Sequence, residues 1–522
     1  MSEQSREHDP DYERRRREAK KRRRARKRRI AIIKRLAVLG ILLLALVLCI
    51  VIGLKLLNKD RGVQDTPSTA ESADSVVSES TDSGASSESG TTEAVTPSVP
   101  VPGSKEEALA KASKLALQYD YDSAIATLQA WSDQNDGDIK AAIADYTAQR
   151  DACVAVDVST VPHIFFHSLI NDSRGFIVSD QVSEGRVIAN NAAMATVDEF
   201  NHVINQMYEA GFVMISLDDM VIKNADGTFS KNTDLKLPAG KKAFIMSEDD
   251  LSYYHSYGEN GAQGYANRLV LDENGKVKCE YVNPQGETLI GDYDMVPLID
   301  SFIEAHPDFA YHDARPTVAL TGYNGVFGYV TNDYYKDGGN MEKLGQSQKN
   351  WLAAHPEYDY ETDCAEARKI AEAMKAEGWT FASHTYGHLD ANTNSVETLQ
   401  ADHERWKIAV ESIVGPTDKI IFAFGADIGG AGEYTRDNPK YAYFYDQGFR
   451  FFCNCDGTYG WTQFNQNYVR TGRFAIDGFT LYQAMTPEGH SHQRCSYNYE
   501  MLGVHDIASF FDPNRTTPIE SE

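Results

Sequence analysis

Cysteine is scarce in this sequence, with seven among 522 residues. Cys49 lies in an apolar run near the N-terminus, and the other six follow it. Six cysteines permit disulfides, but their spacing is not that of a small disulfide-rich domain. Cys453 and Cys455 are one residue apart and have no second pair, which argues against a cysteine-bound zinc site.

Charge is absent from Leu36–Leu54, a run of 19 residues rich in Leu, Val and Ile. At about 1.5 Å per residue the run nearly crosses a hydrocarbon core of roughly 30 Å, and its flanks extend it. We therefore expect one transmembrane helix over 36–57. The alternative is a cleaved signal peptide, but the run is longer than a usual signal core and no small-residue cleavage site follows before Lys55.

Residues 1–35 are strongly basic, with 16 Lys and Arg against six Asp and Glu, although the whole chain has a net charge of −25. Positive charge beside a membrane span stays on the cytoplasmic side. We interpret this basic tail as a topology signal rather than as a nucleic-acid or lipid site. The expected protein crosses the cell membrane once, with its N-terminus in the cytoplasm, its body outside and no nucleic-acid partner.

Aromatic residues are missing from 58–104, and Lys and Arg are missing after Arg61. Ser, Thr, Glu, Asp, Gly and Pro dominate instead, so the segment cannot bury enough apolar surface to offset the entropy lost on ordering. It is predicted to be a disordered linker between membrane and body. The next residues, 105–156, are predicted to be helical, because Ala108, Ala112 and Leu115 recur on one helical face.

From residue 157 short apolar runs alternate with amphipathic segments. Strands are expected at 161–166, 213–217, 242–246, 317–320, 379–383, 420–424 and 449–453, and helices at 196–210, 296–304, 365–376 and 403–413. This alternation is typical of a parallel sheet covered on both faces, closed or open. The polar stretch 259–291 interrupts it and is predicted to be an inserted hairpin.

Two polar clusters directly follow predicted strands. Asp249 and Asp250 come after the strand at 242–246, and His384 and His388 come after the strand at 379–383. In parallel α/β folds the carboxyl ends of strands face one side, where ligands collect. On a helical turn a spacing of four would direct both imidazoles to one side, suited to a single metal. One carboxylate and two imidazoles would leave positions open for water and substrate, as hydrolysis requires.

The glutamate of the zinc peptidase motif is lacking, because Thr385 stands directly after His384. Two histidines at this spacing do not define a metal site by themselves. A general base would have to come from elsewhere in the chain, and the pair Asp249-Asp250 supplies a candidate.

These motifs resemble the polysaccharide deacetylases, carbohydrate esterase family four. Members carry a Thr-Phe-Asp-Asp-Gly-like motif after a strand and, further on, His-(Ser/Thr)-x-x-His. Ser247–Leu251 keeps both aspartates but has Glu248 for the usual aromatic and Leu251 for Gly, while His384–His388 matches fully. Val161–Ser168 also resembles the opening strand of many extracellular members.

The resemblance covers roughly 157–480 and implies a distorted (β/α) barrel within a catalytic domain at 157–522. It implies that Asp249 is the general base and that Asp250, His384 and His388 bind one divalent ion, zinc in the first place, with cobalt, nickel or manganese as alternatives. The implied reaction removes an N-acetyl group, less often an O-acetyl group, from a cell-wall or extracellular polysaccharide such as peptidoglycan, with a metal-bound water as nucleophile. We expect a monomer.

Two parts of the family pattern are incomplete. The third motif usually has Arg and Pro near an aromatic, whereas Ile420–Ala426 has Phe424 but neither of them. Arg470 or Arg473, on a predicted late strand, is a candidate to replace that charge. The late Leu-x-x-His-like segment that supplies a general acid is not found, and the candidates for it are His490, His492 and His505.

Three residues are predicted to contact the substrate: Tyr323, Phe424 and Arg473. Tyr323 belongs to the run Leu320–Gly325, which follows a strand and is expected to line the cleft. The incomplete motifs keep a second interpretation open, in which the chain is a catalytically silent glycan-binding or envelope-scaffold protein on the same fold.

Overall fold

The computed structural model describes residues 103–255, 262–336, 339–430 and 432–520. The predicted basic tail 1–35, transmembrane helix 36–57 and nearly all of the linker 58–104 lie outside these residues. None of the helices in the described part has the length and apolar character that a bilayer crossing needs.

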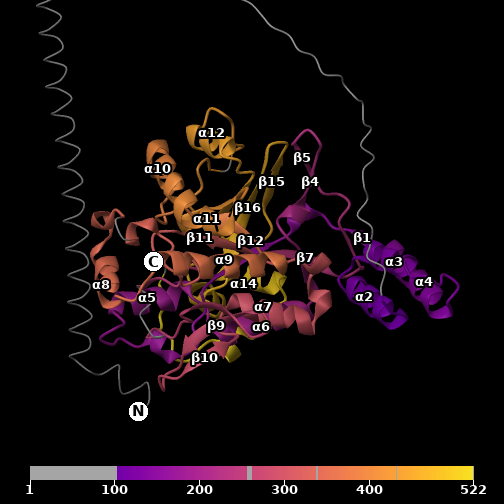
Figure 1. Cartoon of the computed structure of the whole chain (residues 1–522), viewed down its shortest axis with the longest axis horizontal. Coiled ribbons are helices and arrows are strands. Elements are labelled where there is room, and N and C mark those ends of the chain that lie inside the picture. Colours follow the sequence, from indigo (N-terminus) through magenta and orange to yellow (C-terminus); the bar gives the residue numbers. More distant parts are fainter. Residues whose placement is uncertain (1–102, 256–261, 337–338, 431, 521–522) are drawn as a thin grey trace, which may run out of the picture. The chain divides into compact units, whose positions relative to one another are not determined.

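Three helices open the described chain, within the stretch predicted to be helical. They are α2 (Lys105–Leu117), α3 (Tyr121–Gln129) and α4 (Gly137–Ala152), and they lie beside one another (Figure 1). Ser104, Asp120 and Asp136 cap their N-termini through side-chain oxygens. Ala108, Ala112 and Leu128 pack in one cluster with inward-facing residues of the main sheet, so the helical segment is attached by apolar burial.

Seven parallel strands close into a barrel, which confirms the predicted α/β barrel. Around the ring they are β2 (His163–His167), β7 (Lys242–Asp249), β11 (Thr317–Leu320), β12 (Thr380–Ser383), β13 (Lys419–Ile421), β14 (Phe451–Cys455) and β16 (Tyr468–Ala475). The ring closes because β11 pairs with β7, Thr317–Ala319 lying opposite Ser247–Asp249. β3 (Phe212–Met214) pairs in parallel with β7, and β15 (Thr462–Asn465) pairs antiparallel with β16.

The barrel strands are apolar on both faces, as expected for parallel strands that are covered on both sides. Small residues such as Ala319 and Ala382 pack with Ile421 in one cluster, and larger residues such as Phe244 and Met246 belong to a second cluster with the helices. Burying one such large side chain stabilises the fold by about 1.5–3 kcal/mol. The packed interior holds the carboxyl ends of the strands in a fixed ring.

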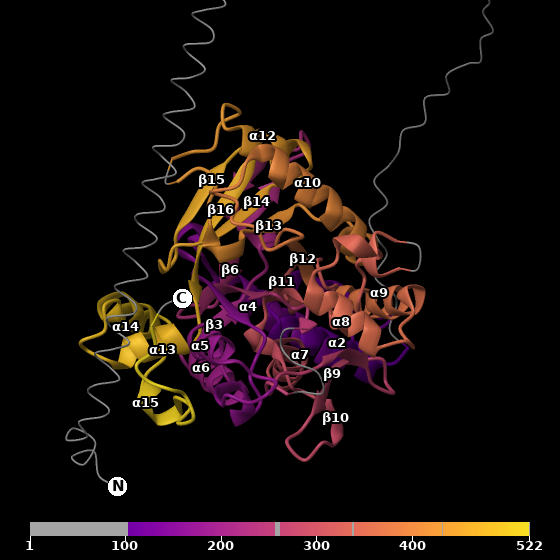
Figure 2. The same cartoon turned by 90° about the vertical axis from the view of Figure 1, so that its left-hand side faces the viewer.

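The helices around the barrel follow the predicted alternation, and several were not expected. They are α5 (Glu184–Ala193), α6 (Val197–Glu209), α7 (Met295–Ala305), α8 (Gln346–Ala354), α9 (Tyr360–Ala376), α10 (Val396–Trp406), α11 (Ser412–Val414), α12 (Pro439–Asp446), α13 (Gly478–Met485), α14 (His492–Met501) and α15 (Ile507–Phe510). A π-helical turn at Lys407–Glu411 joins α10 to α11. Helices α13, α14 and α15 lie together (Figure 2).

The predicted hairpin at 259–291 is wrong in strand number. The structure has a three-stranded antiparallel sheet of β8 (Arg268–Leu271), β9 (Val277–Val282) and β10 (Thr288–Gly291). No residue of β10 is buried. The strand therefore lacks the alternation of apolar and polar residues by which a third strand could be recognised in the sequence. Two further small sheets pair β1 (Val154–Ala155) with β6 (Lys236–Leu237), and β4 (Val221–Lys223) with β5 (Phe229–Lys231).

Candidate metal centre

The acidic cluster lies at the carboxyl end of β7. The strand continues through Asp249, two residues beyond Ser247, so these side chains share the inner face of the barrel. Asp250 is the first residue after the strand and has a left-handed backbone, with φ of 64°. β11 lies between β7 and β12, whose last residue, Ser383, directly precedes His384.

The histidine pair lies on an irregular turn rather than on a helical one. Thr385 and His388 have left-handed φ values of 61° and 52°, which a helix does not contain. Asp402 of α10 holds the turn, because its carboxylate accepts the backbone N–H groups of Tyr386 at 2.7 Å and Gly387 at 2.8 Å. A spacing of four residues suits this turn as well as a helix, so the sequence alone could not separate the two.

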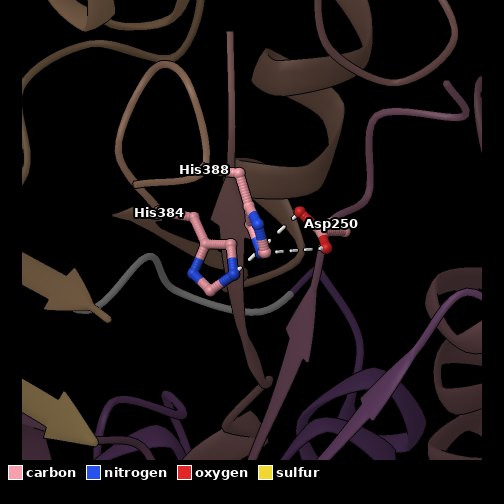
Figure 3. A group of neighbouring side chains, drawn as sticks. All are labelled: Asp250, His384 and His388. Carbon is pink, nitrogen blue, oxygen red and sulfur yellow. Dashed lines mark ion pairs between the residues drawn. The ribbon is translucent and has the colours of Figure 1, made fainter. Parts of the chain in front are cut away.

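Asp250, His384 and His388 converge on one point (Figure 3). Nε2 of His388 lies 3.6 Å from one carboxylate oxygen of Asp250, and Nε2 of His384 lies 4.0 Å from the other. Nδ1 of His384 lies 2.8 Å from the carbonyl oxygen of Ile421, which can only accept, so Nδ1 carries the hydrogen. The lone pair of His384 Nε2 therefore faces the carboxylate.

These three side chains fit a divalent metal ion. The ligand atoms all lie within 4.8 Å of one another, and donors about 2.0–2.2 Å from a zinc ion stand roughly 3–4 Å apart. The hydroxyl of Tyr254 donates to Asp250 and lies 2.5 Å from Oγ1 of Thr321, which fixes the carboxylate. Tyr323, predicted to contact substrate, stacks on Tyr254 with ring centroids 4.9 Å apart.

Asp249 forms a buried ion pair with Arg473 of β16. Nη1 and Nη2 of Arg473 donate to the two carboxylate oxygens at 2.7 and 2.8 Å, and both residues are nearly inaccessible to solvent. Burial alone would raise the pKa of Asp249, but the charge of Arg473 outweighs it and holds the pKa well below its ordinary value. Arg470, the other candidate, binds Asp427 instead.

A family model for polysaccharide deacetylases matches residues 345–434, which include His384, His388 and Phe424. This segment of the chain is therefore similar to a polysaccharide deacetylase domain. The match indicates a hydrolase of carbon–nitrogen bonds other than peptide bonds, with deacetylation as the general reaction.

Among solved structures, the deacetylase PplD of Streptococcus pyogenes in complex with acetate is similar, with 13% sequence identity and a TM-score of 0.29. The likeness covers 64% of this chain and all of that one. No curated protein matches the sequence.

The sequence prediction did not include a third histidine near this group, His167, which ends β2. It lies opposite Asp249 in the parallel register of β2 and β7, and it is near enough to Asp249 and His388 to alter their pKa values. Its Nδ1 lies 3.0 Å from the carbonyl oxygen of Ala193, so Nδ1 donates and Nε2 is the nitrogen left for other partners. Its position at the end of the opening strand was the available signal.

The three histidines that were candidates for the proton donor are exposed or bond to backbone carbonyl groups near them in the sequence. His492 of α14 bonds through Nδ1 to the carbonyl oxygen of Gln483, and His505 bonds to that of Gly503. His490 is exposed just before α14. In the described part of the chain none of the three belongs to the possible metal-ligand group of Asp250, His384 and His388.

Phe424 extends from the turn after β13 and is 70% exposed, although large aromatic side chains are usually buried. Its ring meets that of His388 edge to face, with centroids 4.4 Å apart. The backbone there is left-handed at Phe424 (φ 59°) and at Gly425 (φ 62°). A side chain at Gly425 would lie 2.4 Å from Cβ of Cys455, so the turn that exposes Phe424 requires this glycine.

Replacing Asp402 by alanine is expected to weaken zinc binding about 10–100-fold, because two backbone N–H groups that hold the histidine turn lose their acceptor. Competition with a chromophoric chelator measures the affinity. Asp390→Ala is the matched control, since Asp390 likewise accepts two backbone N–H groups but in the following turn. Equal affinities in the two variants would show that Asp402 does not position the ligands.

Proposed function

We propose that this chain is a metal-dependent deacetylase that removes N-acetyl groups from a cell-wall or extracellular polysaccharide. The observation that carries the proposal is the convergence of Asp250, His384 and His388 beside Asp249, a carboxylate kept ionised by Arg473. Nitrogen and oxygen donors of this kind favour zinc and also suit cobalt, nickel or manganese. A divalent ion held there would supply Lewis acidity toward a carbonyl oxygen and toward water.

The chain's own residues account for the proton transfers. Asp249 accepts a proton from the attacking water as its oxygen bonds to the acetyl carbon. His167, in its protonated form with a hydrogen on both ring nitrogens, donates the Nε2 proton to the sugar nitrogen as the carbon–nitrogen bond breaks, leaving acetate and a free amine. An amine leaves poorly without that proton, so a histidine opposite the base suits an N-acetyl substrate.

The exposed ring of Phe424 is proposed as a platform for a sugar ring next to the reacting group. We expect Phe424→Ala to raise KM for N-acetylglucosamine oligomers about tenfold with little change in kcat, since aromatic contacts contribute about 0.5–1.5 kcal/mol beyond their buried area. Steady-state kinetics measures both constants. Tyr497→Ala, which removes an exposed ring of α14, is the control and should change neither.

The proposed setting is the outer face of the cell membrane, with one helix as the anchor, which rests on the apolar run 36–54 and the basic residues before it. The incomplete third motif keeps open the alternative of a silent glycan-binding or envelope-scaffold protein. The position of Arg473 beside Asp249 supports an active site instead, because it supplies the charge that the motif lacks.

The test is acetate release from N-acetylglucosamine oligomers and from peptidoglycan by the purified protein, before and after removal of metal and with zinc or cobalt restored. We expect release that stops with a chelator and returns with the metal. Glycan binding without acetate release at any metal loading would refute the proposal and favour the silent glycan-binding protein.

A further inference from the structure

The carboxyl end of helix α5 lies directly behind His167. The last carbonyl groups of a helix have no partner within it and present partial negative charge. The carbonyl oxygen of Ala193, the final residue of α5, takes the Nδ1–H of His167. The orientation of the imidazole therefore depends on where this helix end is held.

One side chain from the far end of the sequence binds the same helix end. Nη1 of Arg515 donates to the carbonyl oxygen of Asn191 at 3.0 Å, and Nη2 donates to that of Met194 at 2.7 Å. These two carbonyl groups flank Ala193 in the chain. Arg515 is thus a cation at a helix C-terminus, where charge and hydrogen bonding both favour it.

Arg515 is itself held by a buried carboxylate. Its Nε and Nη2 bond to the two oxygens of Glu199 at 2.8 and 2.5 Å, and both side chains are completely inaccessible to solvent. Glu199 also belongs to the capping box of α6 with Thr196. The planar guanidinium joins the start of α6 to the end of α5, which a lysine's single ammonium group cannot do equally well.

The surroundings leave little room for movement. A side chain at Gly478, the first residue of α13, would lie 2.2 Å from the carbonyl oxygen of Asn191 and 2.3 Å from Nη1 of Arg515. The N–H of Gly478 donates to Met194, and the N–H of Thr516 donates to Asn191. The carboxyl end of α5 is therefore packed and bonded from the C-terminal segment and from α13 together.

We propose that Arg515 is a positioning residue for the reaction: by fixing the end of α5, it holds the Ala193 carbonyl that orients His167. The proposal rests on the proposed role of His167 as the proton donor. The Ala193 carbonyl keeps one hydrogen on Nδ1, so Nε2 is the nitrogen that takes up a proton and donates it to the substrate nitrogen. The C-terminal segment around residues 512–519 is then part of the catalytic apparatus, although it does not touch the reacting atoms.

The test compares Arg515→Lys with the wild-type protein, both loaded with zinc. Lysine keeps a positive charge beside Glu199 but cannot bond to Glu199 and to the carbonyl groups of α5 at the same time. We expect kcat to fall about 10–100-fold with KM changed less than about twofold, as for a small displacement of a catalytic group. Histidine ¹⁵N NMR reports the tautomer of neutral His167, whose signal is assigned as the one that disappears in His167→Gln. In Arg515→Lys this signal should show a smaller share of the Nδ1–H tautomer than in the wild type. An unchanged kcat and an unchanged tautomer would overturn the proposal.

Arg315→Lys is the matched control, because Arg315 is equally buried and is paired with Asp300 and Asp313 away from α5. It should leave kcat and the His167 signal unchanged, and a fall equal to that of Arg515→Lys would mean a general effect of losing a buried arginine. If Arg515→Lys does not fold, Glu199→Gln/Arg515→Gln removes both charges and is measured in the same way, with the same result expected.

His167→Gln separates the two proposals. If it keeps full activity, the role of His167 in the proposed function is wrong and the role of Arg515 is wrong with it. If it loses activity while the Arg515 variants keep theirs, only the role of Arg515 is wrong.

Discussion

Replacing Asp249 by asparagine is expected to lower kcat by about 10²–10⁴-fold, because an amide cannot accept the proton of the attacking water. Zinc binding should persist, since Asp249 is not among the three converging side chains. Acetate release at saturating substrate measures kcat, and elemental analysis of the same sample measures zinc.

Asp427→Asn is the matched control for that experiment, because Asp427 is likewise paired with a buried arginine of β16, Arg470. It should leave kcat within a few-fold of the wild type. If Asp249→Asn bound zinc and its kcat were also within a few-fold of the wild type, Asp249 would not be the general base.

Replacing Arg473 by glutamine is expected to lower the free energy of unfolding by about 3–5 kcal/mol at pH 7, because it leaves the Asp249 carboxylate buried without a counter-charge. Urea unfolding at pH 7 measures the loss. The double variant Asp249→Asn/Arg473→Gln should recover most of it, since two amides of similar shape carry no buried charge. No recovery in the double variant would mean that the ion pair is not the source of the loss.

The pH dependence of stability should differ between the wild type and Arg473→Gln. In the wild type the folded pKa of Asp249 is depressed, so its contribution is present above the unfolded value of about 3.9 and is lost as pH falls further. In Arg473→Gln, burial raises the pKa of Asp249 in the folded state above its unfolded value. The stability contributed by the protonated Asp249 side chain is then fully present below about pH 3.9 and is lost as pH rises. The difference in free energy of unfolding between the wild type and Arg473→Gln should therefore become smaller from pH 7 to pH 4. A difference that stays constant would mean that Arg473 does not lower the pKa of Asp249.

The barrel was predictable because parallel strands that are buried on both faces are continuous apolar runs. Val318, Ala319 and Leu320 illustrate this, since all three are fully buried and consecutive in the sequence. The two polar clusters could be assigned to one end of the sheet for the same reason, because each directly follows such a run. The order of the strands around the sheet is not visible in the sequence, so the sequence does not predict that β11 pairs with β7 and closes the ring.

The rest of the site depends on contacts between residues far apart in the chain. Arg473 meets Asp249 across 224 positions, and Arg515 meets Glu199 across 316, and no local pattern records either pairing. His167 is a single histidine at a strand end, which has no spacing to recognise. The turn of His384–His388 depends on left-handed residues and on Asp402 of another element, so its form could not be derived from its own five residues.

The metal content of the purified protein and of the His384→Ala variant shows whether Asp250, His384 and His388 bind a metal ion. We predict about one zinc ion per chain in the wild type after dialysis against trace zinc, and loss of that ion in His384→Ala with the fold retained by circular dichroism. A wild-type protein without bound metal, or a His384→Ala variant that keeps a full equivalent, would contradict a metal centre at Asp250, His384 and His388.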